Sequence, residues 1–140
     1  MNANIIKLID KLESGRLIGR PLMEPEDIEA ALDARDGQNF DSKWVSLSDE
    51  IEKRKNLEPE QENALEKIRE LAYKAAYKTS NHADFAGYVS DDFDLIGNAI
   101  LLEISDTWLA GLFAEYIDGR FPSGEIKEAG MGLDDLLKSY

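Results

Sequence analysis

Apolar residues recur every three or four positions through most of the chain, with polar and charged residues between them. This spacing places the apolar side chains on one face of an α-helix, whereas the strict alternation typical of half-buried strands is hard to find. The pattern therefore predicts an all-α fold. We expect about six or seven helices in one compact, bundle-like domain that covers residues 1–140.

Proline, glycine and capping residues divide the first half of the chain into four predicted helices. The first two occupy residues 5–12 and 24–36. Either Asp41 or Ser42 suits the N-cap position of the third helix, because short polar side chains satisfy the free N–H groups of a first turn. Pro59 opens the fourth helix, whose apolar positions follow the helical spacing: Leu65, Ile68, Ala72 and Ala75.

The second half predicts a turn near residue 81 and a short helical piece over residues 83–89. Ser90 resembles the N-cap of a separate helix that reaches Ile104 and is apolar nearly all round, which is typical of a central helix. Asp106 suits the N-cap of the next helix. Residues 133–140 form a short last helix in this prediction.

The chain is strongly acidic, with 29 acidic residues against 16 basic ones and a formal charge of −13. Nucleic acids and anionic membranes are poor partners for such a protein, because both attract a basic surface. A basic protein is a better candidate. The acidity is most one-sided between Lys78 and Arg120, where Lys and Arg are missing and acidic residues are frequent: Asp84, Asp91, Asp92, Asp94, Glu103, Asp106, Glu115 and Asp118.

Several classes of chemistry find no support in the residues. The absence of Cys leaves neither disulfides nor thiolate ligands, and zinc would have to use the single His82 with carboxylates. The first ten residues lack the features of a secretory signal, and no apolar run approaches the ~20 residues that span a bilayer. We therefore expect a cytoplasmic protein without metal or cofactor.

One segment matches part of a calcium-binding loop. Residues 92–103 carry Asp at positions one and three, Gly at six and Glu at twelve, but Ile96 at position five has no side-chain oxygen. The three aspartates at positions 91, 92 and 94 also fit a helix start, where carboxylates offset the positive end of the helix dipole. We favour the second interpretation, although it does not explain the missing Lys and Arg residues that follow.

Catalysis is not predicted. Ser80, His82 and Asp84 superficially offer a nucleophile, a base and an orienting group, but the glycine-flanked turn that presents such a nucleophile is missing. The aromatic residues mostly follow helical spacing and are expected in the core. Tyr88 is the expected exception, because it lies beside acidic residues and tyrosines among carboxylates are frequent contacts for basic proteins.

In size, helical pattern, lack of Cys and acidity, the chain resembles the small acidic immunity proteins of bacterial contact-dependent growth inhibition. The segments 88–93 (YVSDDF) and 116–122 (YIDGRFP) share their general character. The resemblance implies a cognate toxin, often a basic nuclease, that is neutralised by one-to-one binding over its active site. The expected contact residues are the following: Asp84, Tyr88, Asp91, Asp92, Asp94, Asp106, Glu115 and Asp118. The alternative is a regulatory or adaptor helical domain, or a DNA mimic, that binds a different basic protein.

Overall fold

The computed structural model describes residues 2–140, and over this range it contains seven α-helices, a 3-10 helix and no β-strand. The all-α prediction is therefore confirmed. The elements follow the chain in this order: α1 (Ala3–Glu13), η1 (Pro25–Asp27), α2 (Ile28–Arg35), α3 (Gln38–Arg54), α4 (Pro59–Ser80), α5 (Ala83–Leu101), α6 (Thr107–Ile117) and α7 (Leu133–Ser139).

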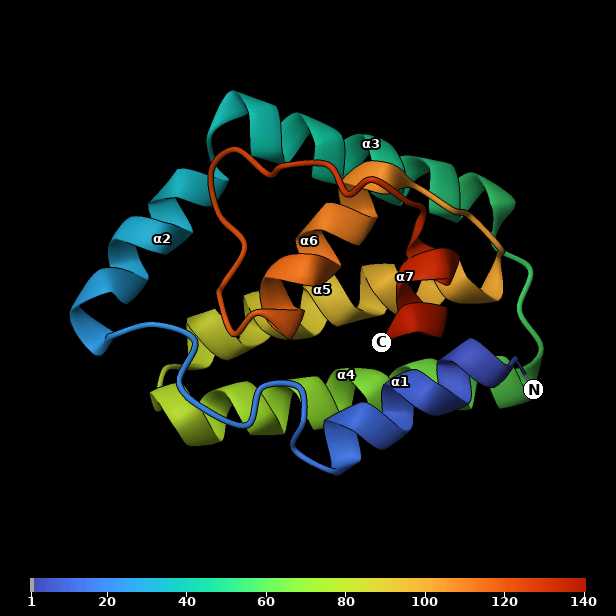
Figure 1. Ribbon diagram of the computed structural model, residues 1–140, viewed down its shortest axis with the longest axis horizontal. Coiled ribbons are helices and arrows are strands. Elements are labelled where there is room, and N and C mark those ends of the chain that lie inside the picture. The colour runs from blue at the N-terminus through green and yellow to red at the C-terminus, as the bar shows by residue number, and fades with distance from the viewer. Residues whose placement is uncertain (1) are drawn as a thin grey trace.

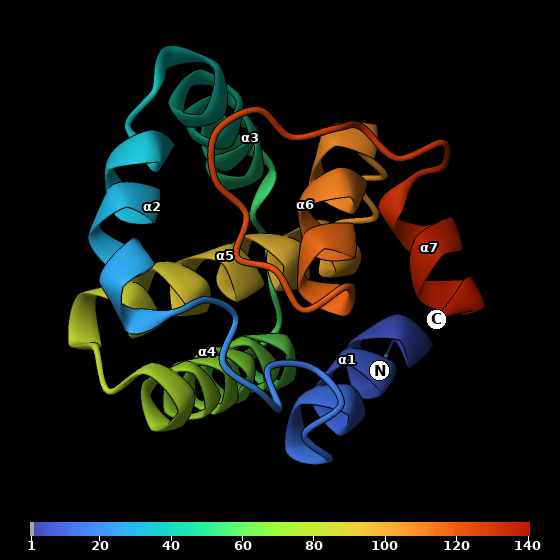
Figure 2. The same ribbon diagram turned by 60° about the vertical axis from the view of Figure 1, so that its left-hand side comes forward.

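The antiparallel pair α4 and α5 forms the centre of the molecule, and the other helices pack around it (Figure 1). Helix α1 lies beside α4, and α7 contacts both α1 and α6. Figure 2 shows α3 and α6 on the side of α5 that faces away from α4. Because α5 is covered on two sides, most of its C-terminal half is buried, as the apolar pattern predicted.

A glycine allows α4 and α5 to approach closely. A Cβ atom at Gly97 would lie 2.7 Å from Cδ2 of Leu65 and 3.4 Å from Cδ1 of Ile68. One helical turn before Gly97, Phe93 packs against Phe113 and Tyr116 of α6, with ring centroids 6.3 Å and 4.8 Å away. The core therefore extends through α5 from α4 to α6.

Of two capping predictions, the structure confirms one and contradicts the other. The carboxylate of Asp106 accepts a hydrogen bond from the backbone N–H of Leu109 at 2.8 Å, so its role as the N-cap of α6 is confirmed. The prediction that Asp41 or Ser42 caps α3 is wrong, because the helix begins at Gln38 and Gly37 is its N-cap residue. Asp41 instead lies in the first turn, where its charge complements the helix dipole.

The predicted break at Ser90 is also wrong, because α5 is one continuous helix. The Ser90 hydroxyl donates to the backbone carbonyl of Arg69 at 3.1 Å, so it bridges α5 to α4 instead of capping a helix end. The N-cap is His82, whose Nδ1 accepts from the N–H of Phe85 at 3.1 Å. Packing of the apolar stripe against α4 favours helix on both sides of Ser90, which overrides the local capping signal.

Residues 121–129, called the strap below, follow α6 without helical structure and run back along it toward α7 (Figure 1). The backbone N–H of Ala129 donates to the carbonyl of Thr107 at 3.1 Å. A Cβ atom at Gly111 would lie 2.2 Å from the carbonyl oxygen of Lys127, so only glycine lets the strap lie this close to α6. Across residues 2–140, the structure contains no helix with both the length and the apolar character needed to span a bilayer.

Candidate functional site

A fully buried carboxylate organises the interior between α5, α2, α3 and α6. The guanidinium of Arg35 donates two hydrogen bonds to Asp92, from Nη2 to Oδ1 at 2.5 Å and from Nη1 to Oδ2 at 2.7 Å. Trp44 Nε1 donates to Oδ1 at 3.0 Å, and the Tyr116 hydroxyl donates to Oδ2 at 2.6 Å. Four donors thus satisfy a carboxylate that has no exposed surface, as burial of a charge requires.

Aromatic rings surround the Arg35 guanidinium on its remaining sides. Its central carbon lies 4.5 Å from the ring centroid of Phe40, 5.0 Å from that of Phe121 and 5.2 Å from that of Tyr88. Nη1 also donates to the backbone carbonyl of Pro122 at 3.3 Å. Arg35 therefore ties α2 to α3, α5 and the strap at the same time.

The charge states in this network follow from its geometry. Burial by itself would lower the pKa of Arg35, but the adjacent Asp92 raises the pKa of the guanidinium above its ordinary value. Burial, together with the charge of Asp92, raises the pKa of the Tyr116 hydroxyl well above 10.0. The tyrosine thus remains a neutral hydrogen-bond donor, and Arg35 remains a cation at physiological pH.

This placement changes the role of Asp92. It was expected on a partner-binding surface, but it lies in the interior with all its strong acceptor positions in use. Residues 92–101, which form most of the calcium-like segment, belong to helix α5 and so do not form a loop that would wrap around an ion. Among the residues described, no cluster of His, Cys, Asp and Glu has an arrangement that could hold a metal ion.

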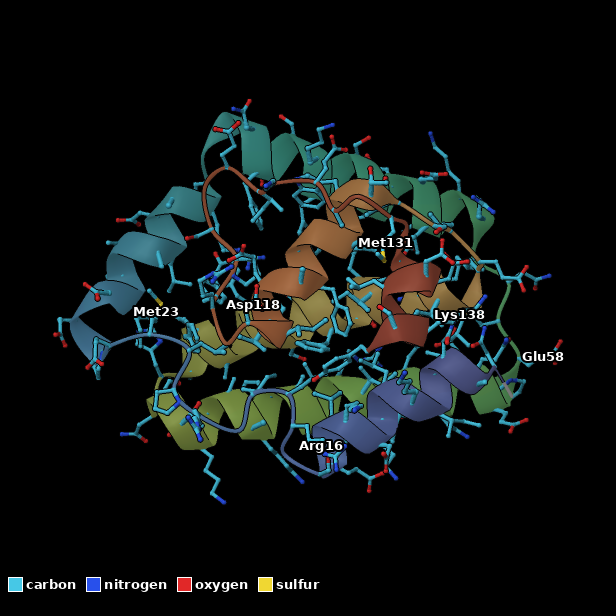
Figure 3. All side chains as sticks on the ribbon, viewed as in Figure 1. Arg16, Met23, Glu58, Asp118, Met131 and Lys138 are labelled. Carbon is cyan, nitrogen blue, oxygen red and sulfur yellow. The ribbon has the colours of Figure 1, made fainter. Side chains whose placement is uncertain are left out.

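Basic residues from outside the stretch 79–119 compensate several of its other acidic residues. Arg69 of α4 pairs with Asp94 at 2.7 Å. Arg120 pairs with Glu115 at 2.8 Å and with Asp118 at 3.1 Å, at the end of α6 where Figure 3 labels Asp118. The tertiary structure therefore supplies the cations that the stretch itself lacks, and these carboxylates do not form one uncompensated face.

Three of the expected contact residues remain together on the surface, at the N-terminal part of α5. Asp84, Tyr88 and Asp91, called the α5 strip below, follow each other at intervals of four and three positions and so share one side of the helix. Asp84 and Asp91 form no ion pair with any described residue. Partial burial, and then the charges of Asp92 and Asp94, raise the pKa of the Asp91 carboxyl.

Tyr88 connects the α5 strip to the buried network. Its side chain is 37% exposed, while the ring also contacts the Arg35 guanidinium. The expectation that Tyr88 differs from the other aromatic residues of the acidic stretch is therefore confirmed, since Phe85, Phe93 and Phe113 are buried. The Arg35 guanidinium holds the inner side of the Tyr88 ring in place, and the outer side is exposed to solvent.

His82 holds the turn between α4 and α5 in place. Its Nδ1 caps α5, and its Nε2 lies 3.0 Å from Oε1 of Glu29 on α2. The Ser80 hydroxyl accepts from the backbone N–H of His82 at 3.1 Å and donates to the carbonyl of Ala76 at 2.7 Å. Of the three groups that resembled a catalytic set, Ser80 and His82 are therefore engaged in turn and capping contacts, whereas Asp84 is exposed.

Sequence reasoning missed Arg35, the residue that decides where Asp92 lies. One signal was present: Arg35 is the only base between Arg20 and Lys43, within a segment rich in acidic residues. Such an isolated cation on a short helix is a candidate for a buried partner, but its position alone does not show which carboxylate it binds. The residues that form the pair are 57 positions apart.

An all-α fold, an excess of acidic residues and a surface strip of carboxylates around a supported tyrosine define a helical protein suited to binding another protein. Comparison with protein families identifies which kind of binding protein this is. The chain belongs to the family described as Immunity protein PIM1, whose model matches residues 7–123. No curated protein is similar enough to the chain to count as a match. Family membership supports a toxin-neutralising role, implies a partner toxin and suggests a non-catalytic inhibitor.

Proposed function

We propose that this immunity protein protects a bacterial cell by binding a cognate toxin of a contact-dependent growth inhibition system in the cytoplasm. The toxin is a basic nuclease, and the immunity protein neutralises it in a one-to-one complex that covers the active site. The adaptor and DNA-mimic alternatives are less well supported, because the matching family is one of immunity proteins.

The α5 strip is the observation that carries this proposal. Its two carboxylates have no basic partner among the described residues, and they lie seven positions apart on the same side of one helix. At a rise of about 1.5 Å per residue, this places them roughly 10 Å apart along the helix axis. A nuclease needs a cationic cleft to hold the phosphates of its substrate, and two uncompensated carboxylates on a rigid helix are complementary to such a cleft.

Tyr88, between these carboxylates, has the properties of a strong contact residue. Tyrosine provides a large contact area with little loss of side-chain entropy, and it is enriched among the residues that dominate binding energies. The Arg35 guanidinium at 5.2 Å fixes the ring before any partner binds. A ring that is already ordered loses less entropy on binding, so its contacts contribute more to affinity.

The remaining five expected residues contribute unequally to this surface. Asp94, Asp106, Glu115 and Asp118 stay in the proposal as acidic residues that add to the negative field, although each already has a partner or a capping role. Asp92 is not on the surface, so its contribution is to hold the interior together. The overall charge of −13 steers a basic toxin toward the protein and speeds association.

The proposal predicts a toxin gene directly upstream of this one, and the experiment measures binding of the toxin domain that it encodes, by titration calorimetry, together with the nuclease activity of that domain. The wild-type protein should bind in a one-to-one ratio and abolish cleavage of nucleic acid. The variant Asp84→Lys/Asp91→Lys should bind at least about tenfold more weakly, because both new cations face the basic partner. The loss should be largest at low salt, where screening is weakest.

The matched control is Asp10→Lys/Glu66→Lys, which changes the net charge by the same amount at exposed sites on α1 and α4. It should reduce affinity far less than the change in the strip. Wild-type protein that fails to bind the toxin domain would refute the proposal. Equal losses in both variants would show a general charge effect and remove the assignment to the α5 strip.

A further inference from the structure

A groove runs between α3 and the strap, on a different side of α3 from the one that meets α5. Its central part has a volume of about 630 Å³, within the usual range for ligand pockets of roughly 300–1,000 Å³. Hollows of about 260 Å³ and 150 Å³ continue it at either end and share lining residues with it. Asn39, Lys43, Ser46 and Glu50 line it along α3, at intervals of three and four positions.

The groove has an apolar aromatic floor and a mostly acidic rim. Phe40 and Trp108 meet edge to face at the floor, with ring centroids 5.5 Å apart, and Ile126 of the strap lies beside them. The carboxylates on the rim come from three different elements, and one lysine accompanies them: Glu50, Asp106, Glu125, Glu128 and Lys43. Arg54 already pairs with Glu50 at 3.3 Å, but the other three carboxylates outnumber Lys43, so the rim repels phosphate groups and attracts cations.

The strap forms the outer wall of the groove, and contacts within the protein hold it in place. The strap rests on Gly111 of α6, and the Thr107 hydroxyl donates to Glu128 at 3.0 Å. At the other end of the strap, Arg35 holds the carbonyl of Pro122. A groove with both walls fixed in advance binds a ligand at a smaller entropic cost than one that must form on binding.

We propose that this groove receives a basic, extended peptide segment of the toxin, an inference that rests on the function proposed above. Three turns of α3 line the groove from Asn39 to Glu50, which are about 16 Å apart along the helix axis, and this length matches about five residues of extended chain. Lys or Arg side chains of the segment meet the carboxylates on the rim, and an apolar side chain between them reaches the Phe40 and Trp108 floor. The groove shares no lining residue with the α5 strip, so the toxin is held at two separate surfaces.

Two variants test the occupant and its charge, with the upstream-encoded toxin domain as the probe. Ser46→Tyr places a bulky side chain in the groove from an exposed helix position, and Glu125→Lys reverses one rim charge on the strap. Each should weaken toxin binding by at least about tenfold. Glu24→Lys is the control, because it makes the same charge change in another exposed loop. Thermal unfolding of all three variants checks that the fold is unchanged.

The outcomes separate this proposal from the proposed function. If wild-type protein binds the toxin and both groove variants bind equally well, the groove proposal is refuted while the immunity function stands. If only Ser46→Tyr weakens binding, the groove is occupied but its occupant is not basic, which overturns the assignment of a basic segment. If wild-type protein does not bind the toxin domain, the proposed function itself fails.

Discussion

Replacing Asp92 with alanine is expected to destabilise the protein by about 3–5 kcal/mol, the usual cost of removing one partner from a buried ion pair. The structure shows why the cost lies in this range. The change leaves the Arg35 guanidinium buried without its counter-charge, and it removes the acceptor of Trp44 Nε1 and of the Tyr116 hydroxyl. Each buried donor left without an acceptor by itself costs about 1–3 kcal/mol.

A loss of this size is large for a small domain, whose total stability is typically about 5–15 kcal/mol. Urea unfolding, followed by far-UV circular dichroism and by tryptophan fluorescence, measures it directly. Asp94→Ala is the matched control, because it removes a carboxylate from the same helix two positions away. Asp94 pairs with Arg69 in a half-exposed position, so this control should cost less than about 1 kcal/mol.

The double variant Arg35→Ala/Asp92→Ala completes the test. Once one charge of a buried pair is missing, removing the other costs less, so the two single effects should not add up in the double variant. Additive effects would refute the idea that the pair acts as a unit. An Asp92→Ala protein that unfolds within about 1 kcal/mol of wild type would refute the assignment of a structural role to this carboxylate.

Two further predictions concern α5, the first at Asp91 and the second at the pair of glycines Gly97 and Gly87. Burial and the neighbouring carboxylates raise the pKa of Asp91 in the folded protein, so its ionisation opposes folding at neutral pH. Asp91→Asn should therefore raise the urea midpoint at pH 7, and the gain should vanish as the pH falls toward about 3.9, the unfolded-state pKa of Asp; no gain at pH 7 would contradict this reasoning. Gly97→Ala should destabilise the protein by about 1–3 kcal/mol, because its methyl group meets Leu65 in the core. Gly87→Ala has open space and should stabilise α5 by about 0.5–1 kcal/mol, and thermal unfolding of the two variants compares them.

If Asp91 contacts the toxin as proposed, binding and stability place opposite demands on this residue. A carboxylate whose ionisation opposes folding lies at one end of the proposed contact surface, where its charge would meet a basic partner. The same substitution, Asp91→Asn, is thus expected to raise stability and to lower toxin affinity. Such opposite effects are the usual sign of a residue maintained for function instead of stability.

Arg35 links the two proposed contact surfaces through one guanidinium. It supports Tyr88 of the α5 strip on one side, and on the other it contacts Phe40 at the floor of the groove and the carbonyl of Pro122 in the strap. Lysine could not replace these contacts, because they depend on a planar group with several donors in fixed directions. The interior network is therefore a common support for the surfaces that would meet a toxin.

Much of the fold follows from local features of the sequence. Helix α4 begins at Pro59 as predicted, and α6 begins after Asp106, because proline and capping aspartate act within a few residues of their own position. At Ser90, the same local reasoning predicted a helix start that does not exist. Its side chain carries the same local capping signal, but packing against α4 keeps the helix continuous and gives the hydroxyl a different partner.

The candidate site was only partly predictable for the same reason. The sequence shows that residues 79–119 contain no Lys or Arg, and it shows the spacing of Asp84, Tyr88 and Asp91 along one helix. It does not show that Arg69 and Arg120 approach the other carboxylates from elements outside that stretch. Compensation of charge depends on distance in space, and helical periodicity contains no information about which helices are neighbours.

The amino-acid sequence by itself determined the all-α class, the excess of negative charge and the exclusion of cysteine chemistry, since each depends on composition or on spacing within one helix. Only the tertiary structure decided which carboxylates are buried, which are paired and which remain free. Asp91 and Asp92 are adjacent in the chain, yet one is exposed and the other has no exposed surface, because successive helical positions point about 100° apart and α5 is covered on one of these sides. The groove between α3 and the strap likewise exists only because distant segments meet over Gly111 and Arg35.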